Sequence, residues 1–157
     1  MSERTSIQVL GAGDVAGYRS MLALFAEAFE DRQSYLSNQP DDEYIRALLS
    51  NENFVALVAQ SGSEVVGAIA GYVLPKFEQA RSEFYIYDLA VAESHRRRGV
   101  ATAMIEEVKS LCAKRGVYVI FVQADYGDDP AVALYTKMGV KEEVMHFDIN
   151  PHSRTGQ

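Results

Sequence analysis

The stretch from Ser82 to Gln123 constrains the fold more than any other part of the sequence. Ser82–Val91 has the aromatic and β-branched composition of a strand, and a basic turn, Glu93–Arg98, follows it. From Gly99 to Gly116 the apolar residues recur at helical spacing, and Val117–Gln123 is a second, short strand that we expect to be buried. A strand, a helix and a strand in this order predict two parallel strands joined by a right-handed crossover.

The rest of the chain predicts an antiparallel sheet with further helices around it. Alternating and β-branched runs indicate strands, and apolar residues three and four positions apart indicate buried helix faces. The expected strands are Ser6–Leu10, Phe54–Gln60, Glu64–Leu74 and Val140–Ile149, and the expected helices are Val15–Phe29, Asp41–Ser50 and Pro130–Met138. We therefore predict an α/β fold, with a mixed, mostly antiparallel sheet of about six or seven strands flanked by about four helices.

The first expected helix is followed by a polar segment that we expect to border the substrate. Asp14 stands where it can cap this helix. Asp31–Pro40 is polar, with Ser, Asn, Gln and Pro, so we expect a loop that forms a lip over a substrate. The buried face of the helix is expected to include Val15, Tyr18, Leu22, Phe25 and Phe29.

Length and charge limit the classes of protein to consider. The 157 residues fit one domain, residues 1–157, with a folded core at 5–149 and a polar tail at 150–157. Lys and Arg number 15 against 22 Asp and Glu, which gives a net charge of −7. This charge disfavours binding to nucleic acid and attracts polycationic small molecules.

Cysteine, histidine and hydropathy patterns argue against several other classes. Cys112 is the only cysteine, which excludes an internal disulfide and favours a reducing, cytoplasmic setting with Cys112 as a buried structural thiol. His146 and Asp148 alternate on one expected strand without a third ligand at suitable spacing, so we expect no metal site. No apolar run approaches the roughly 20 residues of a membrane span, and a signal peptide's apolar run is missing. We expect a soluble protein that is not exported and does not bind membranes.

The turn before Gly99 is the sharpest chemical signal. A basic, glycine-containing turn that opens a helix presents unpaired N–H groups and the positive end of the helix dipole, which suit a pyrophosphate. The alternative interpretation is a solvated basic loop without a ligand. The sequence has neither the Gly-x-x-x-x-Gly-Lys-Ser/Thr pattern nor the three-glycine dinucleotide fingerprint, so nucleotide hydrolysis and hydride transfer are disfavoured.

Two ordered motifs resemble those of the GNAT acetyltransferase superfamily. Arg96-Arg97-Arg98-Gly99-Val100-Ala101 resembles its Arg/Gln-x-x-Gly-x-Gly/Ala coenzyme A loop. Asp129–Val140 resembles its second signature, Asn-x-x-Ala-x-x-Leu-Tyr-x-x-x-Gly-Phe, with Asp128 or Asp129 in place of Asn and Val140 in place of Phe. The chain from about Ile7 to Asp148 is also similar to one branch, the aminoglycoside 3-N-acetyltransferases of the gentamicin-resistance type. The segments that carry this likeness are Tyr72–Gln79, Glu83 with Tyr85–Val91, Val122–Pro130 and Glu142–Ile149.

The resemblance implies acetyl-CoA as the co-substrate and direct transfer within a ternary complex. A backbone N–H near Leu89–Val91 would polarise the thioester carbonyl, and the phenol of Tyr135 would protonate the departing thiolate. The alternative for Tyr135 is an aromatic side chain packed in the core. The residues that the resemblance assigns to coenzyme A are Leu89, Ala90, Val91, Arg96, Arg97, Arg98, Gly99, Val100, Ala101, Thr102, Ala131, Leu134, Tyr135 and Lys137.

Activation of an amine requires a carboxylate or a water held by one. Asp88, on the strand beside the coenzyme contacts, is our first choice of base, and Glu83 is the alternative. Asp88 also has a structural interpretation, in which it binds a backbone N–H or a bulge. An acidic wall that attracts an ammonium-bearing sugar is expected from Asp125, Asp128, Asp129 and Asp148, although such carboxylates in ordinary loops only form turns and caps. Tyr126 is also expected to bind the substrate.

We therefore expect an acetyl-CoA-dependent N-acetyltransferase that acetylates the 3-amino group of aminoglycosides and confers resistance to them. The nearest alternative is the same chemistry on a polyamine, a peptide N-terminus or a lysine. The alternative from another class is a non-catalytic coenzyme A binding module. The resemblance also implies a homodimer.

Overall fold

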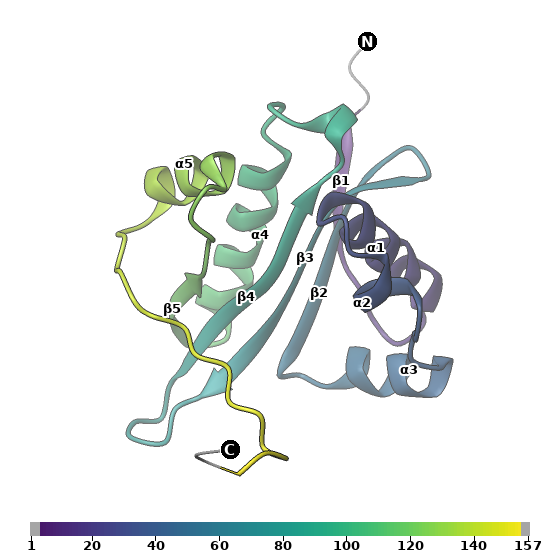
Figure 1. Ribbon diagram of the computed structural model, residues 1–157. Helices are drawn as coiled ribbons and strands as arrows, with labels where there is room; N and C mark the ends of the chain where they lie inside the picture. Colours follow the sequence, from purple (N-terminus) through teal and green to yellow (C-terminus); the bar gives the residue numbers. More distant parts are fainter. Residues whose placement is uncertain (1–3, 155–157) are drawn as a thin grey trace. The chain divides into compact units, whose positions relative to one another are not determined.

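The computed structural model describes residues 4–154, and Figure 1 shows the course of the chain. The chain divides into two compact units, one that runs to Gln123 and one that begins at Ala124. The first unit contains the sheet and four α-helices, and the second contains one further α-helix.

The first unit is built on a mixed sheet in the order β1-β2-β3-β4-β5. Each of the first four strands is antiparallel to the next, and β5 is parallel to β4. The parallel pairing predicted for the two strands joined by a helix is therefore confirmed. The strands are β1 (Thr5–Val9), β2 (Phe54–Ser61), β3 (Glu64–Pro75), β4 (Ser82–Val91) and β5 (Val117–Val122).

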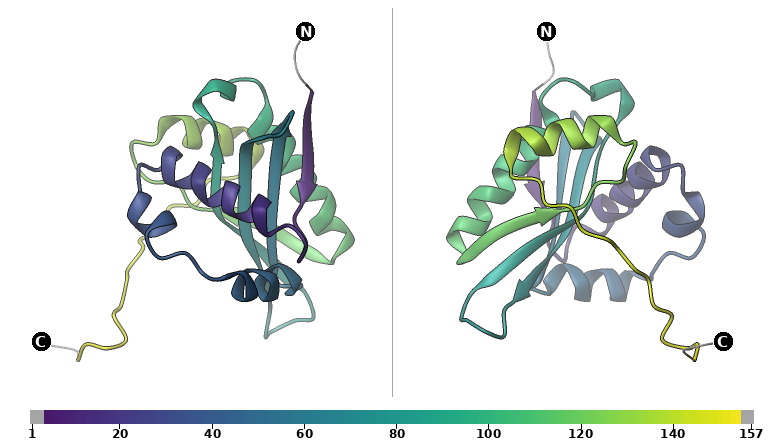
Figure 2. Two further views of the ribbon diagram at one scale, coloured as in Figure 1. Left: turned by 90° about the vertical axis from the view of Figure 1, so that its right-hand side faces the viewer. Right: turned by 60° about the vertical axis from the view of Figure 1, so that its left-hand side comes forward.

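Helices cover both faces of this sheet. Figure 2 shows α1, α2 and α3 on one face and α4 on the other. The alternation of side chains along a strand explains the two layers. Ala56 and Val58 pack in a core cluster with residues of α1 and α3, whereas a Cβ on Gly67 would meet Val100 and Met104 of α4 at 3.0 Å. The helices are α1 (Val15–Ala28), α2 (Arg32–Leu36), α3 (Asp42–Ser50) and α4 (Val100–Lys114), and a 3₁₀ turn, Glu93–His95, precedes α4.

The predicted count of elements is slightly wrong. Residues 4–154 contain five strands and five α-helices, where about six or seven strands and about four helices were expected. The strand expected at Val140–Ile149 is not formed, and this stretch of the second unit has no regular secondary structure. Apolar residues such as Phe147 and Ile149 stand two apart there, but a strand also needs a neighbour for its backbone N–H and C=O groups. The sequence pattern alone does not supply that neighbour.

Three smaller expectations also need correction. Phe29 stands just beyond the end of α1 and is exposed, although helical spacing placed it on the buried face. β5 is partly exposed, at Tyr118 and Val119, because it lies at the edge of the sheet. Asp14 precedes α1, but its carboxylate accepts a hydrogen bond from the N–H of Gly11 at 2.8 Å and caps no helical N–H.

The predicted buried face of α4 is confirmed at its centre. Met104, Ile105, Val108 and Cys112 are all buried. Burial raises the pKa of the Cys112 thiol, so the thiol stays protonated at neutral pH. The structural interpretation of this cysteine agrees with its surroundings.

A bulge in β4 lies directly beside Asp88. Ala70 of β3 faces Asp88, but the next residue, Gly71, faces Ile86, so Tyr87 is an extra residue in β4. Such a bulge bends the strand and redirects its side chains. Gly71 permits the close approach, since a Cβ there would stand 2.5 Å from the Phe84 ring and 2.6 Å from the Tyr85 carbonyl oxygen.

Gly71→Ala should therefore destabilise the fold by about 1–3 kcal/mol, the usual cost of forcing an atom into a packed core. The free energy of unfolding in urea measures this effect. Gly13→Ala is the matched control, because a Cβ at Gly13 meets no atom within 4 Å, and its unfolding free energy should change by less than about 0.5 kcal/mol. Equal stability of the two variants would contradict this account of the bulge.

Candidate active site

β4 pairs with a strand on each side only over its first half. Its parallel register with β5 ends where Ile86 faces Val122, whereas its antiparallel register with β3 continues to Val91. Within the part of the chain that the structure describes, the far edge of Leu89–Val91 therefore has no strand beside it. An unpaired strand edge offers backbone N–H and C=O groups to a ligand. The carbonyl-binding N–H is expected in this same segment.

The basic turn between β4 and α4 has an unusual backbone. Gly99 has a φ of 80° and Arg97 a φ of 63°, so both residues are in the left-handed region. α4 then begins at Val100, and its N-cap residue, Gly99, has no side chain that could accept from the first N–H groups of the helix. The N–H groups of the first helical turn are therefore available to an anion, with the helix dipole behind them. Arg96 fastens the turn to β4, because its Nε donates to the Val91 carbonyl at 3.1 Å.

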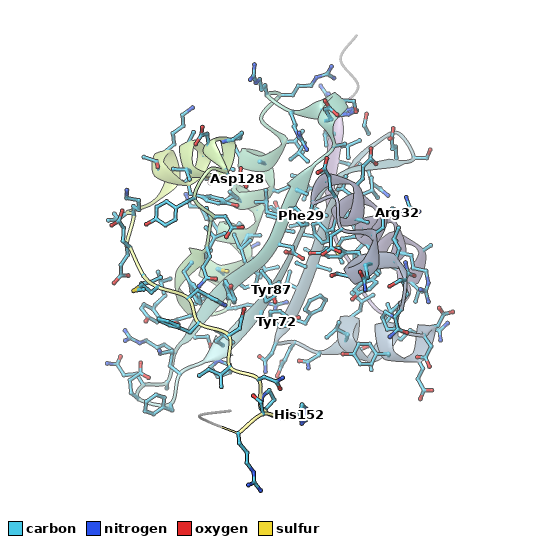
Figure 3. The ribbon with its side chains drawn as sticks, in the orientation of Figure 1. Phe29, Arg32, Tyr72, Tyr87, Asp128 and His152 are labelled. Carbon is cyan, nitrogen blue, oxygen red and sulfur yellow. The ribbon has the colours of Figure 1, made fainter. Side chains whose placement is uncertain are left out.

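A cavity of about 250 Å³ lies beside Asp88, on the face of the sheet that α1 covers. Its walls are mainly aromatic and apolar, and Asp88 is the only charged side chain among its lining residues. Figure 3 shows Tyr72 and Tyr87 next to each other on the sheet, and their ring centroids are 6.0 Å apart in an edge-to-face arrangement. The cavity is lined by Tyr18, Met21, Leu22, Phe25, Ser34, Tyr35, Asn38, Gln39, Pro40, Leu48, Phe54, Ala70, Tyr72, Tyr87 and Asp88.

The carboxylate of Asp88 is partly buried and makes a side-chain hydrogen bond. Tyr35 donates its hydroxyl proton to Asp88 Oδ2 at 2.7 Å. Burial raises the pKa of Asp88, and the hydrogen bond from Tyr35 opposes that rise. A carboxylate with a raised pKa at the wall of a cavity suits a group that takes up a proton.

Tyr35 is not among the site residues expected from the sequence, because Asp31–Pro40 was expected to be a loop. The segment contains the short helix α2, and Asp31 caps it by accepting from the N–H of Ser34 at 3.0 Å. The expected lip does border the cavity, through residues such as Ser34, Asn38 and Gln39. The Asp-x-x-Ser spacing is the one local signal for α2, and it is a weak one.

Glu83, the alternative base, lies outside this cavity. It accepts a hydrogen bond from the Tyr118 hydroxyl at 2.7 Å and pairs with Lys76 at 3.6 Å. These partners hold the pKa of Glu83 below its ordinary value, the Tyr118 hydrogen bond most of all. Glu83 precedes Asp88 by five residues of β4, which is roughly 15 Å along a strand.

The second unit contains α5 (Asp129–Met138) and the remaining predicted site residues. Asp128 caps this helix by accepting from the N–H of Ala131 at 3.3 Å. Leu134, Tyr135 and Lys137 follow on α5 itself. Partial burial, and then the Asp128 carboxylate, raise the pKa of Tyr135.

The other predicted substrate-binding residues of the second unit lie outside any helix or at its start. Asp125, Tyr126 and Asp129 are exposed. Asp148 Oδ1 lies 2.9 Å from Nε2 of His146, so these two side chains partner each other. Over residues 4–154, no group of three His, Cys, Asp or Glu side chains is arranged as a metal site requires, and no helix has both the length and the hydropathy to cross a membrane.

Comparison with protein families identifies the fold. Residues 18–140 match the acetyltransferase (GNAT) family. The chain therefore belongs to the GNAT acetyltransferase family.

Solved structures with similar sequences cover nearly the whole chain. One is an aminoglycoside acetyltransferase from an uncultured soil metagenomic sample, with 54% identity, a TM-score of 0.92, and coverage of 96% of this chain and 99% of that one. Another aminoglycoside acetyltransferase from such a sample, solved in complex with sisomicin, has 30% identity, a TM-score of 0.86, and coverage of 93% and 95%.

Curated relatives are more distant. N-acetyltransferase 8B of Rattus norvegicus is 25% identical over 125 residues, which are 72% of this chain and 56% of the relative. The chain thus spans little more than half the length of that protein.

Proposed function

We propose that this protein is an acetyl-CoA-dependent N-acetyltransferase that acetylates the 3-amino group of aminoglycosides by direct transfer and thereby confers resistance. The observation that carries the proposal is a tyrosine-lined cavity in which Asp88 is the one charged lining residue. Asp88 stands on β4, and the pairing of β4 with β5 ends before it, at Ile86. The likeness to two aminoglycoside acetyltransferases, one of them bound to sisomicin, supports the substrate class.

The cavity suits a substrate amine. One carboxylate among tyrosine rings attracts an ammonium group through its charge and through the negative faces of the rings. The amine must lose a proton before it attacks, and Asp88, directly or through a water, accepts that proton. The nitrogen then forms a bond to the thioester carbonyl carbon, the carbon–sulfur bond breaks, and Tyr135 donates its proton to the thiolate.

Glu83 is the less favourable base. Its partners, Tyr118 and Lys76, stabilise the ionised form, and it lines no part of the cavity. Asp125, Asp128, Asp129 and Asp148 are proposed, from the family resemblance, to bind other ammonium groups of the substrate, and Tyr126 is proposed as a further substrate contact.

Acetyl-CoA is proposed to lie between the open edge of β4 and the first turn of α4. Backbone groups of Leu89, Ala90 and Val91 bind the thioester arm, and the turn binds the pyrophosphate. The turn and helix residues in this role are Arg96, Arg97, Arg98, Gly99, Val100, Ala101 and Thr102. The family resemblance also assigns Ala131, Leu134, Tyr135 and Lys137 of α5 to coenzyme A, and we propose the same role for them here.

Arg97→Ala and Arg98→Ala should each weaken acetyl-CoA binding roughly tenfold or more, since a charge-assisted hydrogen bond is worth about 1.5–3 kcal/mol. Binding is retained in part, because the N–H groups of α4 remain. Titration calorimetry measures the affinity. Lys114→Ala, which removes the same charge from the other end of α4, is the control and should bind acetyl-CoA as the wild type does. Unchanged affinity in both arginine variants would remove the turn from the site.

The substrate proposal is tested by incubating the protein with acetyl-CoA and gentamicin or sisomicin, and by locating the acetylated nitrogen by mass spectrometry and NMR. Acetylation of N-3 supports the proposal, and acetylation of another amino group overturns its regiochemistry. Spermidine, a peptide with a free N-terminus and a lysine peptide are tested in parallel, and a preference for one of them moves the substrate to that class. Binding of acetyl-CoA without turnover of any amine would indicate a coenzyme A binding module.

Cellular setting and assembly are part of the same proposal. We propose that residues 1–157 act as one catalytic domain in the cytoplasm, where the lone Cys112 stays reduced. A homodimer is proposed from the family resemblance, and ultracentrifugation of the purified chain tests it.

A further inference from the structure

Asp88 is held by a residue from a distant part of the chain. Tyr35 of α2 stands 53 positions before it and donates to its Oδ2 at 2.7 Å. Both side chains line the same cavity. The hydrogen bond therefore connects the segment over the cavity to the strand beneath it.

The phenol of Tyr35 is fixed in place by its surroundings. Its ring packs against Phe25 and Phe29, with ring centroids 5.8 and 5.9 Å away. α2 is fixed at its start by the Asp31 cap.

The chain beyond α2 is fastened to α1. Arg19 donates to Gln39 Oε1 at 2.5 Å, to the Pro40 carbonyl at 3.2 Å and to Asp42 Oδ1 at 2.6 Å. These contacts anchor the C-terminal end of the segment that carries Tyr35. The hydroxyl is thus held toward Asp88 before any substrate arrives.

We propose that Tyr35 is a positioning residue for Asp88 in the acetyl transfer. This inference rests on the proposed function, in which Asp88 accepts the proton of the amine. The bond to Oδ2 fixes the orientation of the carboxylate and leaves Oδ1 to face the amine or its water. A carboxylate held in one orientation spends more time in the geometry that is needed for proton transfer, which raises the rate.

The hydrogen bond also sets when Asp88 is ionised. Asp88 acts on the phenols of Tyr35 of α2, Tyr72 of β3 and Tyr85 of β4, and the pKa of each is raised, so none of the three is charged at neutral pH. Tyr18 of α1 and Tyr87 of β4 also line the cavity. Burial therefore favours the neutral acid, and Tyr35 is the donor that favours the carboxylate. Loss of the hydroxyl should raise the pKa of Asp88 further.

The test is Tyr35→Phe, which keeps the ring and removes the donor. We expect kcat at neutral pH to fall about tenfold with little change in KM, because a charge-assisted hydrogen bond to the base is lost. The acidic limb of the kcat/KM profile should move to higher pH. Tyr44→Phe is the matched control, since Tyr44 is an exposed residue of α3, and its rate and pH profile should equal those of the wild type.

Two further measurements separate this inference from the proposed function. Carboxyl NMR should give a higher pKa for Asp88 in Tyr35→Phe than in the wild type, whether or not the protein is active. An unchanged pKa overturns the inference. In a double-mutant cycle, Tyr35→Phe should slow the Asp88→Asn variant no further, and independent effects would also overturn it. A wild-type chain that acetylates no amine overturns the proposed function instead.

Discussion

Asp88→Asn should lower kcat/KM for the amine substrate by about a hundredfold or more. The amide has the shape of the carboxylate but accepts no proton, and a positioned general base contributes typically 10²–10⁴-fold. The side chain still accepts a hydrogen bond from Tyr35, so the cavity keeps its geometry. Steady-state kinetics with saturating acetyl-CoA, measured across pH, give kcat and KM separately. A simple anchor for the substrate would mainly raise KM.

The raised pKa of Asp88 predicts how the reaction rate and the stability of the protein depend on pH. Burial raises the pKa of Asp88, so the wild-type rate should fall as the pH drops through that pKa, and this acidic limb should be lost in Asp88→Asn. An acid whose pKa is raised by folding stabilises the native state below its unfolded pKa and loses that contribution as pH rises through the folded pKa. Replacement by a neutral amide should therefore leave stability at neutral pH equal to the wild type or higher.

Asp41→Asn is the matched control for the charge change. Asp41 caps α3 by accepting from the N–H of Tyr44 at 2.9 Å, and Asn caps helices as well as Asp does. Its kinetics should match the wild type. Full activity of Asp88→Asn together with an inactive Glu83→Gln would transfer the role of base to Glu83.

Elements whose signals are local could be predicted from the sequence. β4 has the predicted bounds, and α4 begins after Gly99 and ends before Gly116, because both glycines adopt the positive φ that marks a helix boundary. The two family motifs are equally local, since each lies within about a dozen residues. Their chemistry can therefore be inferred from the order of the residues alone.

Features that depend on distant partners could not be predicted in this way. The extended pattern at Val140–Ile149 predicted a strand, but a strand also requires a pairing partner that the pattern does not specify. The hydrogen bond between Tyr35 and Asp88 joins residues 53 positions apart, in a segment whose polar composition suggested a loop. The pairing of Gly71 with Ile86, which creates the bulge beside Asp88, likewise emerges only from the sheet register.

Tyr135→Phe should lower kcat by about a hundredfold while the affinity for acetyl-CoA stays nearly unchanged. The variant removes the proposed proton donor for the thiolate and little packing surface, and general acid catalysis is typically worth that factor or more. Partial burial and the Asp128 carboxylate raise the pKa of Tyr135, so the phenol keeps its proton through the neutral range and can donate it. Release of coenzyme A, followed with a thiol reagent, measures turnover, and calorimetry measures the coenzyme affinity.

The basic limb of the rate profile distinguishes a proton donor from a packed aromatic ring. If Tyr135 is the acid, the wild-type rate falls only at pH values above the ordinary pKa of tyrosine, and this limb disappears in Tyr135→Phe. Asp128→Asn keeps a capping side chain on α5 but removes the negative charge, so it should lower the pKa of Tyr135 and move the limb to lower pH. A Tyr135→Phe variant with a kcat within about twofold of the wild type would assign the ring to packing, because a general acid cannot be removed without loss of rate.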